Sequence, residues 1–104
     1  MSKLKIYIMG AVTGLDPEEV RIKFNNAAMR LKEMGFVPIS PIDYVPEGMD
    51  WNQAMRICIS KLIECDGVFK LPDHQQSKGA MLELVIARNL ELKEFTETIK
   101  RSKV

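Results

Sequence analysis

The chain has 104 residues, of which 46% are hydrophobic and 28% are charged, and 15 Lys and Arg against 14 Asp and Glu leave a formal charge of +1. We expect a single domain over residues 1–104, because a chain of this length buries roughly two-thirds of its unfolded surface and this composition excludes disorder. The balanced charge excludes a general nucleic-acid binder, which needs a basic face to displace counterions.

The first half of the chain predicts a strand, a helix, a second strand and a long loop. Residues 3–9 are rich in β-forming residues and too few for a typical helix, which predicts a strand. Asp16 and Pro17 then open a helix whose apolar residues recur at helical spacing until Gly35 closes it. A short strand over residues 36–39 leads into a Pro-rich loop.

The second half repeats this alternation. Asp50 and Gln53 form the capping box of a helix, which ends at Asp66 and the glycine after it. A strand over residues 68–71 follows. Ser77 can cap the next helix, over about residues 78–89, and a weaker, charged strand over residues 90–95 comes last.

This alternation predicts an α/β fold, a small three-layer parallel sheet of about four strands with helices on both faces. In such a sheet, ligands bind beyond the carboxyl ends of the strands, where loops meet helix N-termini. The segments that we expect around a ligand are therefore residues 9–14, the Pro-rich loop and residues 72–79.

Glu83 is the most informative candidate for chemistry. Its neighbours at helical spacing are small or apolar: Gly79, Ala80, Ile86 and Ala87. If this stripe faces the sheet, the carboxylate lies near the strand ends, where burial favours its neutral form unless a partner holds it. In the alternative, the helix is rotated and a different set packs inward: Met81, Leu82 and Val85.

Further candidates lie at the same expected edge. Tyr7, at the exit of the first strand, places a hydroxyl within reach of a carboxylate on the third helix, although a core tyrosine fits the same pattern. Gly10 and Gly14 allow close backbone approach, and amides ahead of a helix suit an anion, but neither Gly-rich phosphate motif is present. Ser77 and Gly79 form a second candidate site for an anion or a hydroxyl, at a helix start.

Other polar residues carry less weight. Asp66, at the start of a buried strand, is either a structural cap or a group that orients the site. His74 has no second His or Cys nearby, so we expect no metal. Asp43 and Glu47 could add carboxylates to the cleft from the Pro-rich loop, but acids in loops are usually solvated.

The cysteines and the apolar segments indicate the cellular compartment of the protein. Cys58 and Cys65 are seven residues apart on one predicted helix, about 10 Å, which is too far for a disulfide and favours buried thiols in a reducing compartment. No apolar run approaches the roughly 20 residues that span a bilayer, and no signal-peptide core is present, so we expect a cytoplasmic protein with no membrane partner. The only basic cluster, Lys100, Arg101 and Lys103, is typical of a solvated tail.

A series of short motifs carries a family resemblance by its order and spacing: Ile6-Tyr7-Ile8-Met9-Gly10, Thr13-Gly14, Trp51, Met55-Arg56, Cys65-Asp66, and Ser77-Lys78-Gly79-Ala80 with Glu83. Over about residues 4–90, the chain resembles the nucleoside 2-deoxyribosyltransferase-like superfamily. It looks nearest to a short bacterial and phage group in that superfamily whose function is uncharacterised.

The resemblance implies a flavodoxin-like or Rossmann-like sheet and cleavage or transfer at the N-glycosidic bond of a nucleoside or nucleotide, without a cofactor or a nucleic-acid polymer. The family's Glu attacks the anomeric carbon and a Tyr holds that Glu, roles that carry over to Glu83 and Tyr7; the Asp that opens the third strand carries over to Asp66. The substrate-binding set is Gly10, Thr13, Gly14, Ser77 and Gly79. Superfamily members are usually oligomers whose neighbours complete the pocket, so we expect a homo-oligomer.

The chain also departs from the family pattern. Cys58 stands where relatives often carry Asp, and Ala11 and Thr13 stand where phosphate-binding members carry Ser and Arg. Near relatives have Gly-Trp where this chain has Asp73-His74. Because a neutral thiol does not replace an acid, two further hypotheses stay open: a non-catalytic nucleotide or nucleotide-derivative binding protein, and a protein-interaction domain.

Overall fold

A computed structural model describes residues 3–97 of the chain. Its strands and helices, in chain order, are β1 (Lys5–Met9), α1 (Pro17–Glu33), β2 (Val37–Ile39), α2 (Trp51–Leu62), β3 (Gly67–Lys70), α3 (Lys78–Asn89) and β4 (Lys93–Thr96). Short 3₁₀ turns, η1 (Pro41–Asp43) and η2 (His74–Gln76), lie within the two segments predicted as loops. The predicted basic tail, Lys100, Arg101 and Lys103, lies outside the described residues. Of the helices described, none has the length and apolar character to cross a bilayer.

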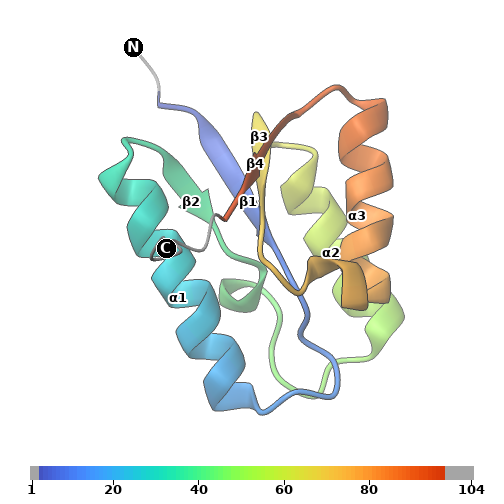
Figure 1. Cartoon of the computed structure of the whole chain (residues 1–104). Coiled ribbons are helices and arrows are strands. Elements are labelled where there is room, and N and C mark those ends of the chain that lie inside the picture. Colours follow the sequence, from blue (N-terminus) through green and yellow to red (C-terminus); the bar gives the residue numbers. More distant parts are fainter. Residues whose placement is uncertain (1–2, 98–104) are drawn as a thin grey trace, which may run out of the picture.

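The strands form one parallel sheet in the order β2-β1-β3-β4. In Figure 1, α1 lies on one face of this sheet, and α2 and α3 lie on the other. The predicted α/β architecture, a parallel sheet between helical layers, is therefore confirmed.

Alternation along β1 sends its side chains into two separate cores. Ile6 and Ile8 pack with Phe24 under α1, whereas Tyr7 and Met9 pack under α2 and α3. These four β1 side chains have no solvent exposure, as expected for a central parallel strand. The hydroxyl of Tyr7 consequently lies in the layer that α3 covers.

Side-chain caps fix where the helices begin. Asp16, Asp50 and Ser77 each accept a hydrogen bond from a backbone N–H of the first turn, as their sequence contexts predict. Helix α3 has the predicted bounds. Helix α2 ends earlier than predicted, at Leu62, so Cys65 lies beyond the helix rather than on it. Both cysteines are buried and free.

Strand β4 begins at Lys93 rather than at the predicted Leu90. Leu90 is the C-cap of α3, and Glu91 takes a left-handed conformation with φ 58°, so these two residues turn the chain back toward the sheet. Glu94 then pairs with Lys70 at 3.0 Å and with Arg88 at 2.9 Å, which holds this charged edge strand in place.

Candidate active site

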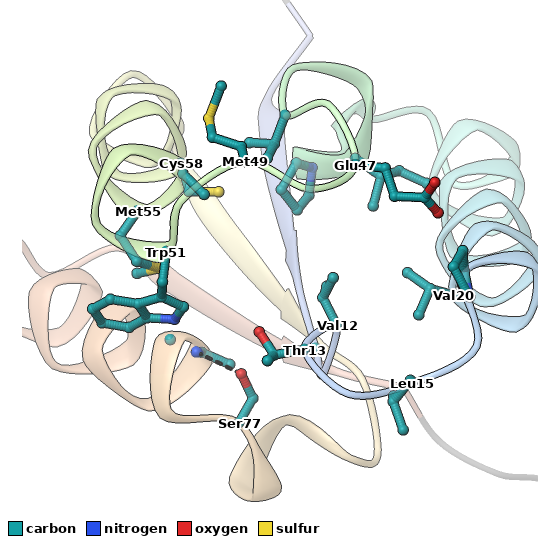
Figure 2. Close-up of a pocket in the computed structure, with 18 of the residues that line it drawn as sticks. Val12, Thr13, Leu15, Val20, Glu47, Met49, Trp51, Met55, Cys58 and Ser77 are labelled. Atoms are coloured by element: carbon teal, nitrogen blue, oxygen red, sulfur yellow. Dashed lines mark hydrogen bonds between the residues drawn. The ribbon is translucent and has the colours of Figure 1, made fainter.

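A cavity of about 550 Å³ lies where α/β proteins bind their ligands, beyond the carboxyl ends of β1 and β3. Five parts of the chain form its walls: the loop after β1, the first turns of α1, the Pro-rich loop after β2, the inner side of α2 and the first turns of α3. Figure 2 shows these walls through Val12, Thr13, Glu47, Met49, Trp51, Met55, Cys58 and Ser77. Apolar side chains dominate, so the few polar groups in the walls stand out.

Glu83 is one of those polar groups, and it is 5% exposed. It lies in the middle of α3 on the helix side that faces the sheet, together with the small residues Gly79 and Ala80 one turn earlier. The apolar residues that would pack inward in the rotated alternative point to solvent instead: Met81, Leu82 and Val85. The rotated alternative is therefore wrong, and the carboxylate lies at the cavity wall.

Tyr7 holds Glu83 directly. The Tyr7 hydroxyl donates a hydrogen bond of 2.7 Å to Oε2 of Glu83, from the centre of β1 to the centre of α3. Among residues 3–97, no group donates to the other carboxylate oxygen, Oε1. One oxygen is thus fixed from beneath, while the other keeps its lone pairs for a ligand in the cavity.

Burial sets the protonation of this group. Loss of water raises the pKa of Glu83 to about 7, although the hydrogen bond from Tyr7 acts in the opposite direction. Burial also raises the pKa of Tyr7, and the nearby carboxylate of Glu83 raises it further. Burial raises the pKa of the Cys58 thiol as well, against a hydrogen bond with Tyr7 that lowers it. At neutral pH, Glu83 therefore titrates while the tyrosine and the thiol keep their protons.

This raised pKa makes stability depend on pH. The pKa of Glu83 is about 7 in the folded protein against an ordinary 4.5, so the folded state keeps this proton longer than the unfolded state does. The contribution is full below pH 4.5, falls as pH rises and is lost once pH passes about 7, a change on the order of 3 kcal/mol. We expect Glu83→Gln, which cannot ionise, to gain that much stability relative to the wild type over this range. Urea unfolding of both proteins across pH measures it, and a pH-independent difference would contradict the raised pKa.

The first loop contributes three of the predicted substrate-binding residues, Gly10, Thr13 and Gly14, and all three line the cavity. Gly10 lies so close to the next loop that a Cβ there would come within 2.6 Å of Cδ1 of Leu71. The absence of a side chain at Gly10 therefore lets the loop that contains Leu71 pack against it. Gly14 has φ +83°, a conformation that other residues rarely adopt. Figure 2 shows the Thr13 side chain directed into the cavity.

The start of α3 contributes the other two, Ser77 and Gly79, which line the same cavity. The Ser77 hydroxyl accepts a hydrogen bond of 3.0 Å from the Ala80 N–H, drawn as a dashed line in Figure 2. A Cβ at Gly79 would come within 2.9 Å of Sδ of Met55, so glycine lets α3 lie against α2. The structure thus brings all five predicted residues to one cavity, and their contact with a substrate stays a prediction.

Asp66 is not brought to this site. It lies at the amino end of β3, exposed, where its Oδ2 accepts a hydrogen bond of 2.8 Å from the Lys5 N–H. Parallel strands begin at one edge of a sheet and end at the other, so a residue that opens β3 lies at the edge opposite the cavity. The structure therefore places Asp66 as the structural cap that the sequence left as one alternative.

The remaining polar candidates also differ in whether they line the cavity. Glu47 lines the cavity and Asp43 does not. His74 lies within the β3–α3 loop, where its Nδ1 is 2.8 Å from the Leu71 carbonyl oxygen. Within residues 3–97, no cluster of His, Cys, Asp or Glu side chains is arranged to hold a metal.

Sequence reasoning missed two cations near the strand ends, Arg21 and Lys23. Both come from the first turns of α1: Arg21 lines the cavity, and Lys23 pairs with Asp73 at 2.5 Å. The available signal was positional, because the N-terminus of a helix that follows a parallel strand lies at the ligand-binding edge of the sheet.

Comparison with known proteins agrees with this geometry. Residues 4–95 match the family described as "Domain of unknown function (DUF4406)". A solved structure, a 2-desoxiribosyltransferase from Leishmania mexicana, is similar with a TM-score of 0.66 and 26% identity over 89% of this chain. This chain spans 63% of the length of that protein. No curated protein matches the chain. The resemblance to the nucleoside 2-deoxyribosyltransferase-like fold is confirmed.

Proposed function

The chain belongs to the family described as "Domain of unknown function (DUF4406)", and we propose that it breaks the N-glycosidic bond of a nucleoside-type substrate with Glu83 as the nucleophile. The observation that carries this proposal is the 2.7 Å hydrogen bond from Tyr7 to Glu83 at the wall of a large cavity. The fold shared with a 2-desoxiribosyltransferase supports the same reaction class.

The proposed reaction has two displacements at the anomeric carbon, C1′. Oε1 of ionised Glu83 attacks C1′, the bond from C1′ to the base nitrogen breaks, and its electron pair leaves with the base, which takes a proton from water. Water or an N–H nitrogen of a second base then attacks C1′ of the glycosyl ester, and the C1′–Oε1 bond breaks to release the Glu83 carboxylate. The attacking group returns a proton to the solvent, and the outcome is hydrolysis or transfer. Positive charge builds on the sugar in each step, and an adjacent carboxylate stabilises it.

The described residues suit these steps. Tyr7 fixes Oε2 and keeps its proton, so it orients the carboxylate and favours its ionised form. We assign Thr13, Gly14 and Ser77 to the sugar and its 5′ group, since they lie at the strand-end wall. The apolar walls that Met49 and Trp51 contribute suit the flat face of a base.

The proposal extends to the cofactor requirement, the cellular compartment and the oligomeric state of the protein. It needs only a carboxylate, a hydroxyl and water, so we propose a cofactor-free enzyme. Two free thiols fit the cytoplasm. The exposed apolar residues of α3, Met81, Leu82 and Val85, suit a contact with a second copy and hence a homo-oligomer.

A nucleoside panel tests this proposal. The protein is incubated with the 2′-deoxynucleosides of adenine, guanine, cytosine and thymine and with their 5′-monophosphates, with and without a second free base. We expect free base to appear, with a new nucleoside as well if the enzyme is a transferase. If no substrate releases base faster than in buffer alone, the proposal is wrong.

One observation favours a second candidate, a binding protein without turnover. Cys58 lines the cavity as a neutral thiol, at a position where the resemblance to the superfamily implies an acid. Such a protein would be stabilised by the same panel, by about 2.7 kcal/mol at 100 times the dissociation constant, and would release no base. If no compound in the panel stabilises the fold, an interaction domain is favoured over both candidates.

A further inference from the structure

Three hydrogen bonds close a ring around Ala11, the first residue of the loop after Gly10. The Ala11 N–H donates to Oδ1 of Asp73 at 3.1 Å, and Nζ of Lys23 donates to the Ala11 carbonyl at 2.7 Å. Lys23 and Asp73 complete the ring with an ion pair of 2.5 Å. Both polar groups of one peptide residue are thus held by two side chains, one from α1 and one from the β3–α3 loop. We call this ring the Ala11 clamp.

The clamp is partly shielded from water. The Lys23 and Asp73 side chains are 24% and 25% exposed, and Ala11 is buried. Burial acts to raise the pKa of Asp73, but the hydrogen bonds from Lys23 and the Ala11 N–H outweigh it and hold the pKa below its usual value. Charge-assisted hydrogen bonds of this kind are stronger than neutral ones.

The clamp is the main attachment of the first loop. Between Ala11 and the cap of α1 at Asp16, the described hydrogen bonds add only an internal turn from the Leu15 N–H to the Val12 carbonyl. Val12, Thr13 and Gly14 follow the clamp directly and line the cavity. If the clamp opens, this wall of the cavity loses its position.

We propose that Lys23 and Asp73 are positioning residues that keep residues 11–14 in their binding conformation before a substrate arrives. This inference rests on the proposed function. Neither side chain is hydrogen-bonded to Tyr7 on β1 or to Glu83 on α3. The clamp therefore affects how tightly a substrate binds and leaves the chemical step largely unchanged.

Amide hydrogen exchange and steady-state kinetics test this together. In Asp73→Ala, we expect faster exchange at Ala11 and the loop amides after it, a rise in KM of about tenfold and a change in kcat of less than about twofold. Lys23→Met should act in the same direction. Asp73→Asn should have a smaller effect, because its Oδ1 can still accept from the Ala11 N–H while the ion pair is lost.

Glu94→Gln is the matched control. It weakens the ion pairs of Glu94 with Lys70 and Arg88, and none of these three residues lines the cavity. We therefore expect both readouts to stay at wild-type values. Unchanged exchange at Ala11 in both Asp73→Ala and Lys23→Met would overturn the clamp. Faster exchange with an unchanged KM would overturn its positioning role. If the wild type releases no base, the proposed function fails, and the exchange rates alone then decide whether the clamp orders the loop.

Discussion

Glu83→Gln is expected to lower kcat for base release by about a thousandfold or more, because a carboxamide cannot attack C1′ or balance the charge that builds on the sugar. Glutamine keeps the size of the side chain, and its carbonyl oxygen can still accept the hydrogen bond from Tyr7. Substrate binding should therefore survive, and the KM should change little. Initial rates of base release at saturating substrate measure the effect.

Glu64→Gln controls for the loss of a carboxylate. Glu64 is exposed beyond the end of α2 and does not line the cavity, so its replacement should leave kcat within about twofold of wild type. If Glu83→Gln retains a kcat within about tenfold of the wild type while remaining folded, Glu83 is not the nucleophile.

Tyr7→Phe is expected to move the acid limb of the pH–rate profile upward. The hydroxyl lowers the pKa of Glu83, so its removal raises that pKa above about 7 and leaves less ionised carboxylate at neutral pH. A hydrogen bond to a charged group is worth about one pKa unit or more, so kcat/KM at neutral pH should fall by about tenfold. At about pH 9, where the carboxylate ionises without help, much of that loss should recover.

Tyr44→Phe is the matched control, because Tyr44 is the other tyrosine in the chain and its side chain is exposed. We expect it to leave the profile unchanged. A uniform loss for Tyr7→Phe at every pH would show that the hydroxyl acts by orienting Glu83 alone. An unchanged profile would contradict any functional link between Tyr7 and Glu83.

Local patterns were sufficient to predict the architecture. The caps at Asp16, Asp50 and Ser77, and the apolar spacing after them, predict α1, α2 and α3, because these signals act within one or two turns. The start of β4 was misplaced because nothing in the sequence marks Glu91 as left-handed.

The rotation of α3 shows where local reasoning ends. One side of α3 carries Glu83 among small residues, and another carries Met81, Leu82 and Val85, so hydrophobicity alone favours the wrong side. The structure places Glu83 inward because Gly79 and Ala80 allow α3 to pack closely, and because Tyr7 supplies a partner for the buried carboxylate. That partner is 76 residues away in the sequence, beyond the reach of any local pattern.

The same limit explains the residues that the sequence did not connect. Lys23 and Asp73 are 50 residues apart, and each alone is an ordinary charged residue of a helix or a loop. Asp66 is the opposite case, since its place at the start of β3 already assigns it to the edge away from the cavity. Strand direction, applied to each candidate in turn, separates Asp66 from the residues that do line the cavity.

Trapping the glycosyl ester tests the central claim most directly. The protein is mixed with excess substrate from the panel, quenched in acid within the first turnover, digested and examined by mass spectrometry. We expect one sugar residue attached to the peptide that contains Glu83, and no such adduct in Glu83→Gln. Rapid release of base by the wild type with no adduct at Glu83, or with an adduct on another residue, would contradict the account.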